Sequence, residues 1–162
     1  MHAALYIEKI HYPLTRKHGA LFEAAIRRRD LFPPAASEAQ AAQQEAAGYY
    51  SLMYAEGYFR DPYNVAGLLG RLGLAWWTDV MPLCTEDRKL CGVELRRFRD
   101  MVAQARLTLP SKAELQMQRG VVEDTGRDSL AEWHNYFIEK RAYLLEFLNK
   151  AIELNSAVYC SL

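Results

Sequence analysis

Residues 129–154 read SLAEWHNYFIEKRAYLLEFLNKAIEL and carry the strongest helix signal in the chain. Ser129, with Glu132 three residues later, forms a capping box, which satisfies free backbone N–H groups at a helix start. The apolar residues that follow recur at helical spacing: Leu130, Trp133, Phe137, Leu144, Leu148 and Ala151. The pattern predicts a long amphipathic helix over about 130–156, with its apolar stripe packed against a core.

Two segments before this stretch carry similar signals. The first has apolar residues spaced 4, 3, 4 and 3 along the chain, which predicts another amphipathic helix. These residues are Cys91, Leu95, Phe98, Val102 and Ala105. In the second segment, Ser111 and Glu114 form a further capping box, and we expect a short helix there that ends near Gly120.

Helix signals also dominate the N-terminal half. Helices are expected from Thr15 to Pro33, over about 38–59 and over about 62–78. Asp61-Pro62 marks the start of the last of these, because Asp is a strong N-cap and Pro is favoured at the first helical position. Within it, Gly67, Gly70 and Gly73 would form a stripe of small residues. No phosphate-binding fingerprint surrounds them, so the stripe favours close helix packing, with a helix break at Gly73 as the alternative.

The two ends of the chain have strand-like patterns. The first dozen residues alternate loosely between apolar and polar, and the last seven, SAVYCSL, include β-branched and aromatic residues. These ends could pair as a small two-stranded ribbon. We therefore expect residues 1–162 to form a single all-α domain, a bundle of five to six helices with this ribbon as an accessory.

Charge argues against nucleic-acid binding. The 20 basic and 20 acidic residues cancel, whereas affinity for nucleic acid comes mainly from Lys and Arg that neutralise phosphates. Local basic clusters occur at Arg27–Arg29 and at Arg96, Arg97 and Arg99. Each lies on an expected helix, where a solvated face is the simpler interpretation and a nucleic-acid surface the alternative.

The sequence also bears on location. No window approaches the about 18 consecutive apolar residues that a membrane-spanning helix needs. Charges at Glu8 and Lys9 interrupt any signal-peptide core. Three cysteines without a CxxC pair favour reduced thiols and a cytoplasmic protein. A disulfide between Cys84 and Cys91, across the loop TEDRKL, is left open.

Three polar residues could recognise a small anion. Arg60 lies among aromatic residues and could stack on a ring, pair with a buried carboxylate or grip an anionic ligand. Asn64 falls in the first turn of the helix expected over 62–78, where free N–H groups can receive an anion. His134 borders the apolar stripe of the long helix, where a hydrogen-bonded core histidine is the simpler interpretation. Together they suggest a nucleotide-like ligand.

Aromatic residues could instead contact a protein. Trp76 and Trp77 lie 100° apart on an ideal helix, so both cannot face inward along it. Either one of them is exposed, or both are buried where the helix ends against the core. An exposed tryptophan near Tyr63 would resemble an interface hot spot, where Trp, Tyr and Arg are enriched.

Signatures of catalysis are absent from the sequence. It contains no HExxH pair, no nucleophile elbow and no His/Cys spacing typical of a metal site. We therefore expect no catalytic residue, no metal and no cofactor, and the sequence argues against an enzyme.

The segments GYFRDPYN (57–64) and GLAWWTDVMPL (73–83), followed by WHNYFIEKRAYLLEFLNKAIEL (133–154), resemble small uncharacterised proteins of bacteria and their phages. Those proteins carry a Tyr-(Phe/Trp)-Arg-x-x-Asn element followed by helices, and the resemblance spans about 57–155. It implies a phage or mobile-element role and no particular activity.

The leading hypothesis is a cytoplasmic, non-enzymatic protein that binds or modulates another protein, or forms a homodimer. Its binding surface would include Arg60, Tyr63, Trp76 and Trp77. The alternative is an enzyme or sensor that binds a small anionic ligand near Arg60, Asn64 and His134.

Overall fold

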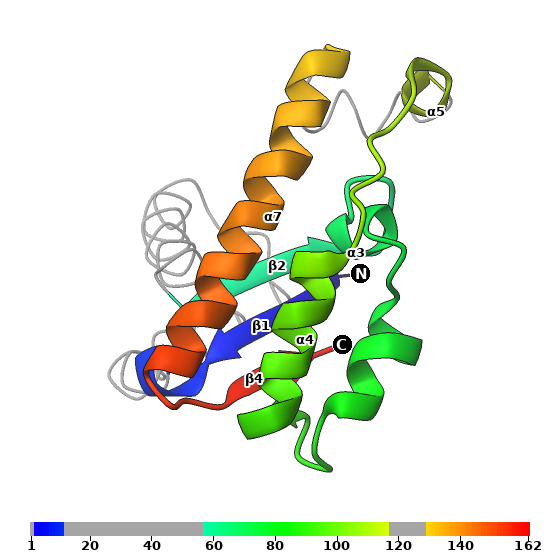
Figure 1. The fold of residues 1–162 in the computed structure, drawn as a ribbon. Coiled ribbons are helices and arrows are strands. Elements are labelled where there is room, and N and C mark those ends of the chain that lie inside the picture. The colour runs from blue at the N-terminus through cyan, green and yellow to red at the C-terminus, as the bar shows by residue number, and fades with distance from the viewer. Residues whose placement is uncertain (1, 12–56, 117–128) are drawn as a thin grey trace, which may run out of the picture.

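Two helices, α4 and α7, lie over one face of a four-stranded antiparallel sheet (Figure 1). The structure is a computed structural model and describes residues 2–11, 57–116 and 129–162. The strands are β1 (His2–Ile7), β2 (Tyr58–Pro62), β3 (Lys89–Leu90) and β4 (Val158–Ser161), in the spatial order β2-β1-β4-β3. The helices are α3 (Leu68–Arg71), α4 (Gly92–Gln104), α5 (Lys112–Gln116) and α7 (Leu130–Glu153), with a π-helical turn η1 (Trp76–Val80) and a 3-10 turn η2 (Met81–Leu83).

The prediction of an all-α bundle is wrong, because the described residues form this sheet beside their helices. The ends of the chain do pair as strands, with Leu5 opposite Cys160 and Ile7 opposite Val158. They are not an isolated ribbon, since β2 adds to β1 on one side and β3 adds to β4 on the other. The fold is therefore mixed α/β, with a helical layer on a sheet.

Some predictions fall outside the described residues. These are the helix from Thr15 to Pro33, most of the helix over 38–59, the arginines at 27–29 and the expected end of a short helix near Gly120. Organisation of residues 1–162 as a single domain also stays a prediction.

Strand β2 lies where one predicted helix ends and the next begins. Its first two residues were expected to be helical, yet Tyr58 and Phe59 pair with Tyr6 and Leu5 of β1. From Phe59 to Asp61 the side chains of β2 alternate as in a strand, with Phe59 and Asp61 buried and Arg60 between them exposed, while Tyr58 at the start of the strand is also buried. The aromatic run before Asp61 is therefore a strand with one face toward the helices.

The helix predicted over 62–78 is wrong for most of its length. Only α3 is α-helical, and η1 follows it as a separate turn. A Cβ on Gly67 would lie 2.3 Å from the carbonyl oxygen of Pro62, so the loop before α3 requires glycine there. Gly73 has a φ of +67°, a conformation that favours glycine, and the helix has ended before it. Gly67 and Gly73 therefore shape the loops on either side of α3, as the alternative of a break at Gly73 anticipated, whereas Gly70 lies within α3.

The local helix signals in the C-terminal half are confirmed. Ser129 Oγ accepts from Glu132 N at 3.1 Å while Glu132 Oε2 accepts from Ser129 N at 3.0 Å, so the capping box at the start of α7 is complete. Ser111 and Glu114 form the equivalent pair before α5. Helix α4 buries the middle of its predicted stripe: Leu95, Phe98 and Val102.

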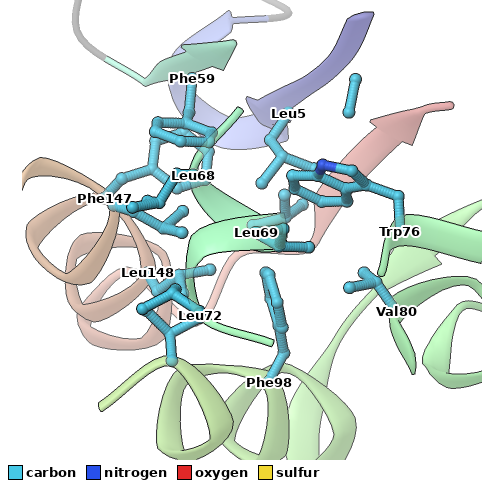
Figure 2. Close-up of a cluster of buried hydrophobic side chains, with 14 of the residues drawn as sticks. Leu5, Phe59, Leu68, Leu69, Leu72, Trp76, Val80, Phe98, Phe147 and Leu148 are labelled. Atoms are coloured by element: carbon cyan, nitrogen blue, oxygen red, sulfur yellow. The ribbon is translucent and has the colours of Figure 1, made fainter. Parts of the chain in front are cut away.

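The core lies between the sheet and the helices (Figure 2). Phe59 of β2 contacts Phe147 of α7, with ring centroids 6.3 Å apart. Trp76 of η1 meets Phe98 of α4 at 6.0 Å. Helix α3 contributes Leu68 and Leu69, which point into the same cluster from the loop that follows β2. The loop between β2 and η1 is thus fixed by the core, and this positions the residues discussed below.

One edge of the sheet is covered by a side chain from α7. The backbone N–H of Ile7 donates to the Gly57 carbonyl at 2.8 Å, so by antiparallel alternation the next carbonyl, that of Tyr58, points away from β1. The hydroxyl of Tyr143 donates to this Tyr58 carbonyl at 2.7 Å. Strand β2 ends the order of the described strands, and this hydrogen bond satisfies one of its carbonyls that point away from β1.

We expect Tyr143→Phe to lower the free energy of unfolding by about 0.5–1.5 kcal/mol, since the ring is kept and one hydrogen bond is lost. Urea denaturation measures the change. Tyr63→Phe is the matched control and should stay within about 0.5 kcal/mol of wild type, because Tyr63 is comparably exposed but its hydroxyl makes no hydrogen bond to the residues that the structure describes. Equal effects of the two substitutions would contradict a specific role for the Tyr143 hydroxyl.

Candidate functional site

Asp61 lies at the centre of a buried polar cluster. Its side chain is 1% exposed, and each carboxylate oxygen accepts two hydrogen bonds. Oδ1 accepts from Leu68 N at 2.6 Å and from Lys140 Nζ at 2.7 Å. Oδ2 accepts from Leu69 N at 3.1 Å and from the indole Nε1 of Trp76 at 3.0 Å. The carboxylate therefore joins β2 to α3, η1 and α7.

Lys140 is satisfied as fully as Asp61. Its ammonium donates to Asp61 Oδ1, to the Tyr136 hydroxyl at 2.9 Å and to the Ala66 carbonyl at 3.3 Å. These acceptors match the three protons of the ammonium. The rings of Tyr136 and Phe59 lie 5.2 and 5.8 Å from Nζ and add cation–π attraction. A lysine with every proton engaged by the protein is suited to holding structure in place.

The predicted N-cap role of Asp61 is corrected by this geometry. Asp61 is part of β2, not the residue before a helix, and the N-cap of α3 is Gly67. Its carboxylate still accepts the first backbone N–H groups of α3, those of Leu68 and Leu69. Asp61 thus satisfies the free N–H groups of a helix start from a neighbouring strand.

Sequence reasoning missed Lys140 and Tyr136. A signal was present, because Lys140 stands three residues after Phe137 and four before Leu144, which places it beside the apolar stripe of α7. A charge in that position needs a buried partner. The sequence alone did not connect it to Asp61, which is 79 positions away.

Two aromatic side chains form an exposed pair, here called the aromatic surface: Tyr63 and Trp77. Tyr63 is 36% exposed and Trp77 is 54% exposed. Their ring centroids lie 6.5 Å apart with the planes tilted by 37°. Trp76, by contrast, is buried and donates to Asp61. The expectation that one of the two tryptophans could be exposed is confirmed, since Trp77 is exposed while Trp76 is packed in the core.

Arg60 and Asn64 lie close to Tyr63 in sequence, but their side chains contact residues outside the aromatic surface. Arg60 is exposed on β2, and its Nη2 lies 3.3 Å from Nδ1 of His2. Partial burial and then the charge of Arg60 lower the pKa of His2. Asn64 Oδ1 accepts from Ala66 N at 2.9 Å, and its carbonyl accepts from Gly67 N at 2.8 Å. Asn64 therefore holds the turn that leads into α3.

His134 is half-buried on α7, and its Nε2 lies 3.2 Å from the carbonyl oxygen of Pro110. It links α7 to the segment before α5. Arg60, Asn64 and His134 thus each engage a different neighbour, and no hydrogen bond seen among the described residues joins any two of them. The structure shows their local roles without assembling them into one site.

The described arginines of the basic cluster on α4 lie toward solvent. Arg96 and Arg97 are exposed, and Arg97 faces Glu94 at 3.7 Å. Arg99 donates to Asp100 at 2.6 Å and to Asn149 of α7 at 2.9 Å. These contacts fit a solvated helix face that also ties α4 to α7.

Two features are absent from residues 2–11, 57–116 and 129–162. No group of three or more His, Cys, Asp or Glu side chains gathers there as a metal site would require. No helix in the same residues is long and apolar enough to cross a membrane.

No family model, curated protein or solved structure matches this chain. The resemblance to small proteins of bacteria and phages therefore stays a prediction.

Proposed function

We propose that the protein acts without catalysis, by binding a partner protein through the aromatic surface. The observation that carries this proposal is the exposed contact between Tyr63 and Trp77. Trp and Tyr are the residues most enriched among interface hot spots, since one rigid ring buries a large area on contact. A tryptophan more than half exposed in the free protein has much of that area still to bury.

The way in which the segment around Trp77 is held in place favours the same function. Trp77 directly follows Trp76, which is packed in the core and hydrogen-bonded to Asp61 at 3.0 Å. Asp79 Oδ2 accepts from Ala75 N at 2.7 Å, so the turn η1 is also fixed at its start. A surface held in place before binding loses little conformational entropy when a partner arrives, and this raises affinity.

The charged cluster gives little support to a catalytic alternative. Asp61 is almost wholly buried, and Lys140 has its ammonium protons engaged by protein acceptors. A general acid, base or nucleophile needs a free position toward a substrate. Binding of a small anion near Arg60, Asn64 and His134 remains the competing proposal. It is the weaker of the two because each of these residues contacts a different neighbour.

The test compares Tyr63→Ala/Trp77→Ala with Ile138→Ala. Ile138 is a matched control because it is also apolar and 52% exposed, but lies on α7. A photo-crosslinking amino acid is placed at position 77 and, separately, at position 138 in cells. We expect a discrete crosslinked adduct from position 77 and a much weaker one from position 138. Added wild-type protein should reduce the yield of the position-77 adduct, whereas the added double variant should not.

The mass of the adduct identifies the class of partner. An adduct of about twice the 18.6 kDa chain would mean a second copy of this protein, and light scattering should then show dissociation of the double variant. A heavier or lighter adduct would mean a different protein. Equal crosslinking from both positions, or undiminished competition by the double variant, would overturn the proposed function.

A further inference from the structure

The two rings of the aromatic surface keep their hydrogen-bond donors available. Neither the hydroxyl of Tyr63 nor the indole N–H of Trp77 makes a hydrogen bond to the residues that the structure describes. The same groups of Trp76 and Tyr143, by contrast, donate to protein oxygens at 3.0 and 2.7 Å. At the aromatic surface, therefore, it is a ligand that has to supply the acceptors.

Asn64 adds a third donor beside Tyr63 in the chain. It is exposed, and its Oδ1 already accepts from the N–H of Ala66 at 2.9 Å. Its acceptor is thus occupied, while its Nδ2 amino group makes no hydrogen bond to the described residues. These donors are all uncharged. The surface therefore suits a ligand with apolar groups and neutral acceptors.

Backbone in the polyproline II conformation has this chemistry. An α-helix uses its carbonyls internally and a strand uses them with its neighbour, whereas polyproline II has no internal hydrogen bonds. Its carbonyls take their donors from outside. Proline also lacks an N–H, so a proline-rich segment brings acceptors and few donors. Its rings pack on aromatic side chains, and its stiff backbone loses little conformational entropy on binding.

The spacing of the rings sets the length of such a segment. The centroids of Tyr63 and Trp77 lie 6.5 Å apart. Polyproline II rises about 3.1 Å per residue, so a run of about three or four residues can contact both rings. The six prolines of this chain include one adjacent pair, Pro33-Pro34, and no run of three. The segment therefore belongs to a different protein.

We propose that the partner of the aromatic surface is a different protein, which presents a proline-rich segment in the polyproline II conformation. The proline rings pack on Tyr63 and Trp77, and the backbone carbonyls of the segment accept from the indole N–H and the hydroxyl. This inference rests on the proposed function, because it names the chemistry of the partner bound at the same surface.

The experiment titrates octaproline, acetylated and amidated at its ends, into protein labelled with nitrogen-15 tryptophan. The chain has three tryptophans, so three indole N–H signals report on binding. We expect the Trp77 signal to move in a saturable manner. Those of Trp76, which donates to Asp61, and of Trp133, which is fully buried, should stay in place. A glycine-serine peptide of the same length is the matched control and should move none of them.

Three variants test the contacts. Tyr63→Phe keeps the ring and removes the hydroxyl, so octaproline should bind about 3- to 10-fold more weakly, as expected for one lost hydrogen bond. Tyr63→Ala also removes the ring and should weaken binding further. Ile138→Ala, on α7, should bind octaproline as wild type does.

Octaproline contains every group that the inference invokes, so its failure to move the Trp77 signal would overturn the inference. Equal responses to the glycine-serine peptide would do the same. Self-association that is lost in Pro33→Ala/Pro34→Ala would also overturn it, since the occupant would then be a second copy of this chain. A crosslinked adduct from position 77 together with no response to octaproline would overturn this inference alone and leave the proposed function standing.

Discussion

Asp61→Asn is expected to lower the free energy of unfolding by about 3–5 kcal/mol, in the range found when one partner of a buried ion pair is removed. The substitution keeps the volume of the side chain but cannot keep its hydrogen bonds. Each carboxylate oxygen accepts from two donors, so the amide NH2 group must face two N–H groups in either orientation. The charge of Lys140 also loses its counter-ion while it remains buried.

A double-mutant cycle with Lys140→Met separates the ion pair from the other bonds of Asp61. Chemical denaturation should show that Asp61→Asn/Lys140→Met is more stable than the sum of the two single losses predicts, by about 0.5–3 kcal/mol. A loss below about 1 kcal/mol for Asp61→Asn, with the fold retained, would show that the cluster does not hold the protein together.

The adjacent tryptophans should respond very differently to truncation. Trp76→Ala is expected to cost about 3–5 kcal/mol, because it opens a cavity in the core and removes the indole N–H from Asp61. Trp77→Ala should stay within about 0.5 kcal/mol of wild type, because its ring is 54% exposed. Urea denaturation followed by circular dichroism measures both without relying on tryptophan fluorescence.

The contrast between Trp76→Ala and Trp77→Ala also distinguishes an effect on stability from an effect on binding. Trp77→Ala should abolish binding of the partner through the aromatic surface while the protein stays folded, and Trp76→Phe offers a milder change of the core tryptophan. Similar destabilisation by Trp76→Ala and Trp77→Ala would mean that Trp77 is part of the core, and the case for an exposed binding surface would fail.

The parts of the fold that sequence predicted are the ones set by nearby residues. The capping box of Ser129 and Glu132 and the stripe through Leu95, Phe98 and Val102 depend on contacts within one or two helical turns. Strand β2 depends on a partner more than 50 positions away, where Phe59 pairs with Leu5. Its aromatic run resembled a buried helix because periodicity alone does not separate short apolar segments of the two kinds.

In the candidate site, too, sequence predicted the features that depend on neighbouring residues and missed those that depend on distant ones. The 100° offset between Trp76 and Trp77 anticipated that one could be exposed, and the structure adds the contact with Tyr63. Sequence predicted that Asp61 would accept backbone N–H groups at a helix start, but not that it would do so from a strand. It did not predict the ion pair with Lys140, which comes from a distant segment. Burial of such an ion pair depends on tertiary structure, which a local sequence pattern does not predict.

The strand order has a consequence for synthesis of the protein on the ribosome. Strand β4 stands between β1 and β3, so the middle of the sheet is completed by residues near position 160. While translation is still short of Val158, β1 can pair with β2, but β3 lacks β4, the strand with which it pairs. The complete sheet can therefore form only after β4 has left the exit tunnel. The same holds for the part of the core to which Cys160 of β4 contributes.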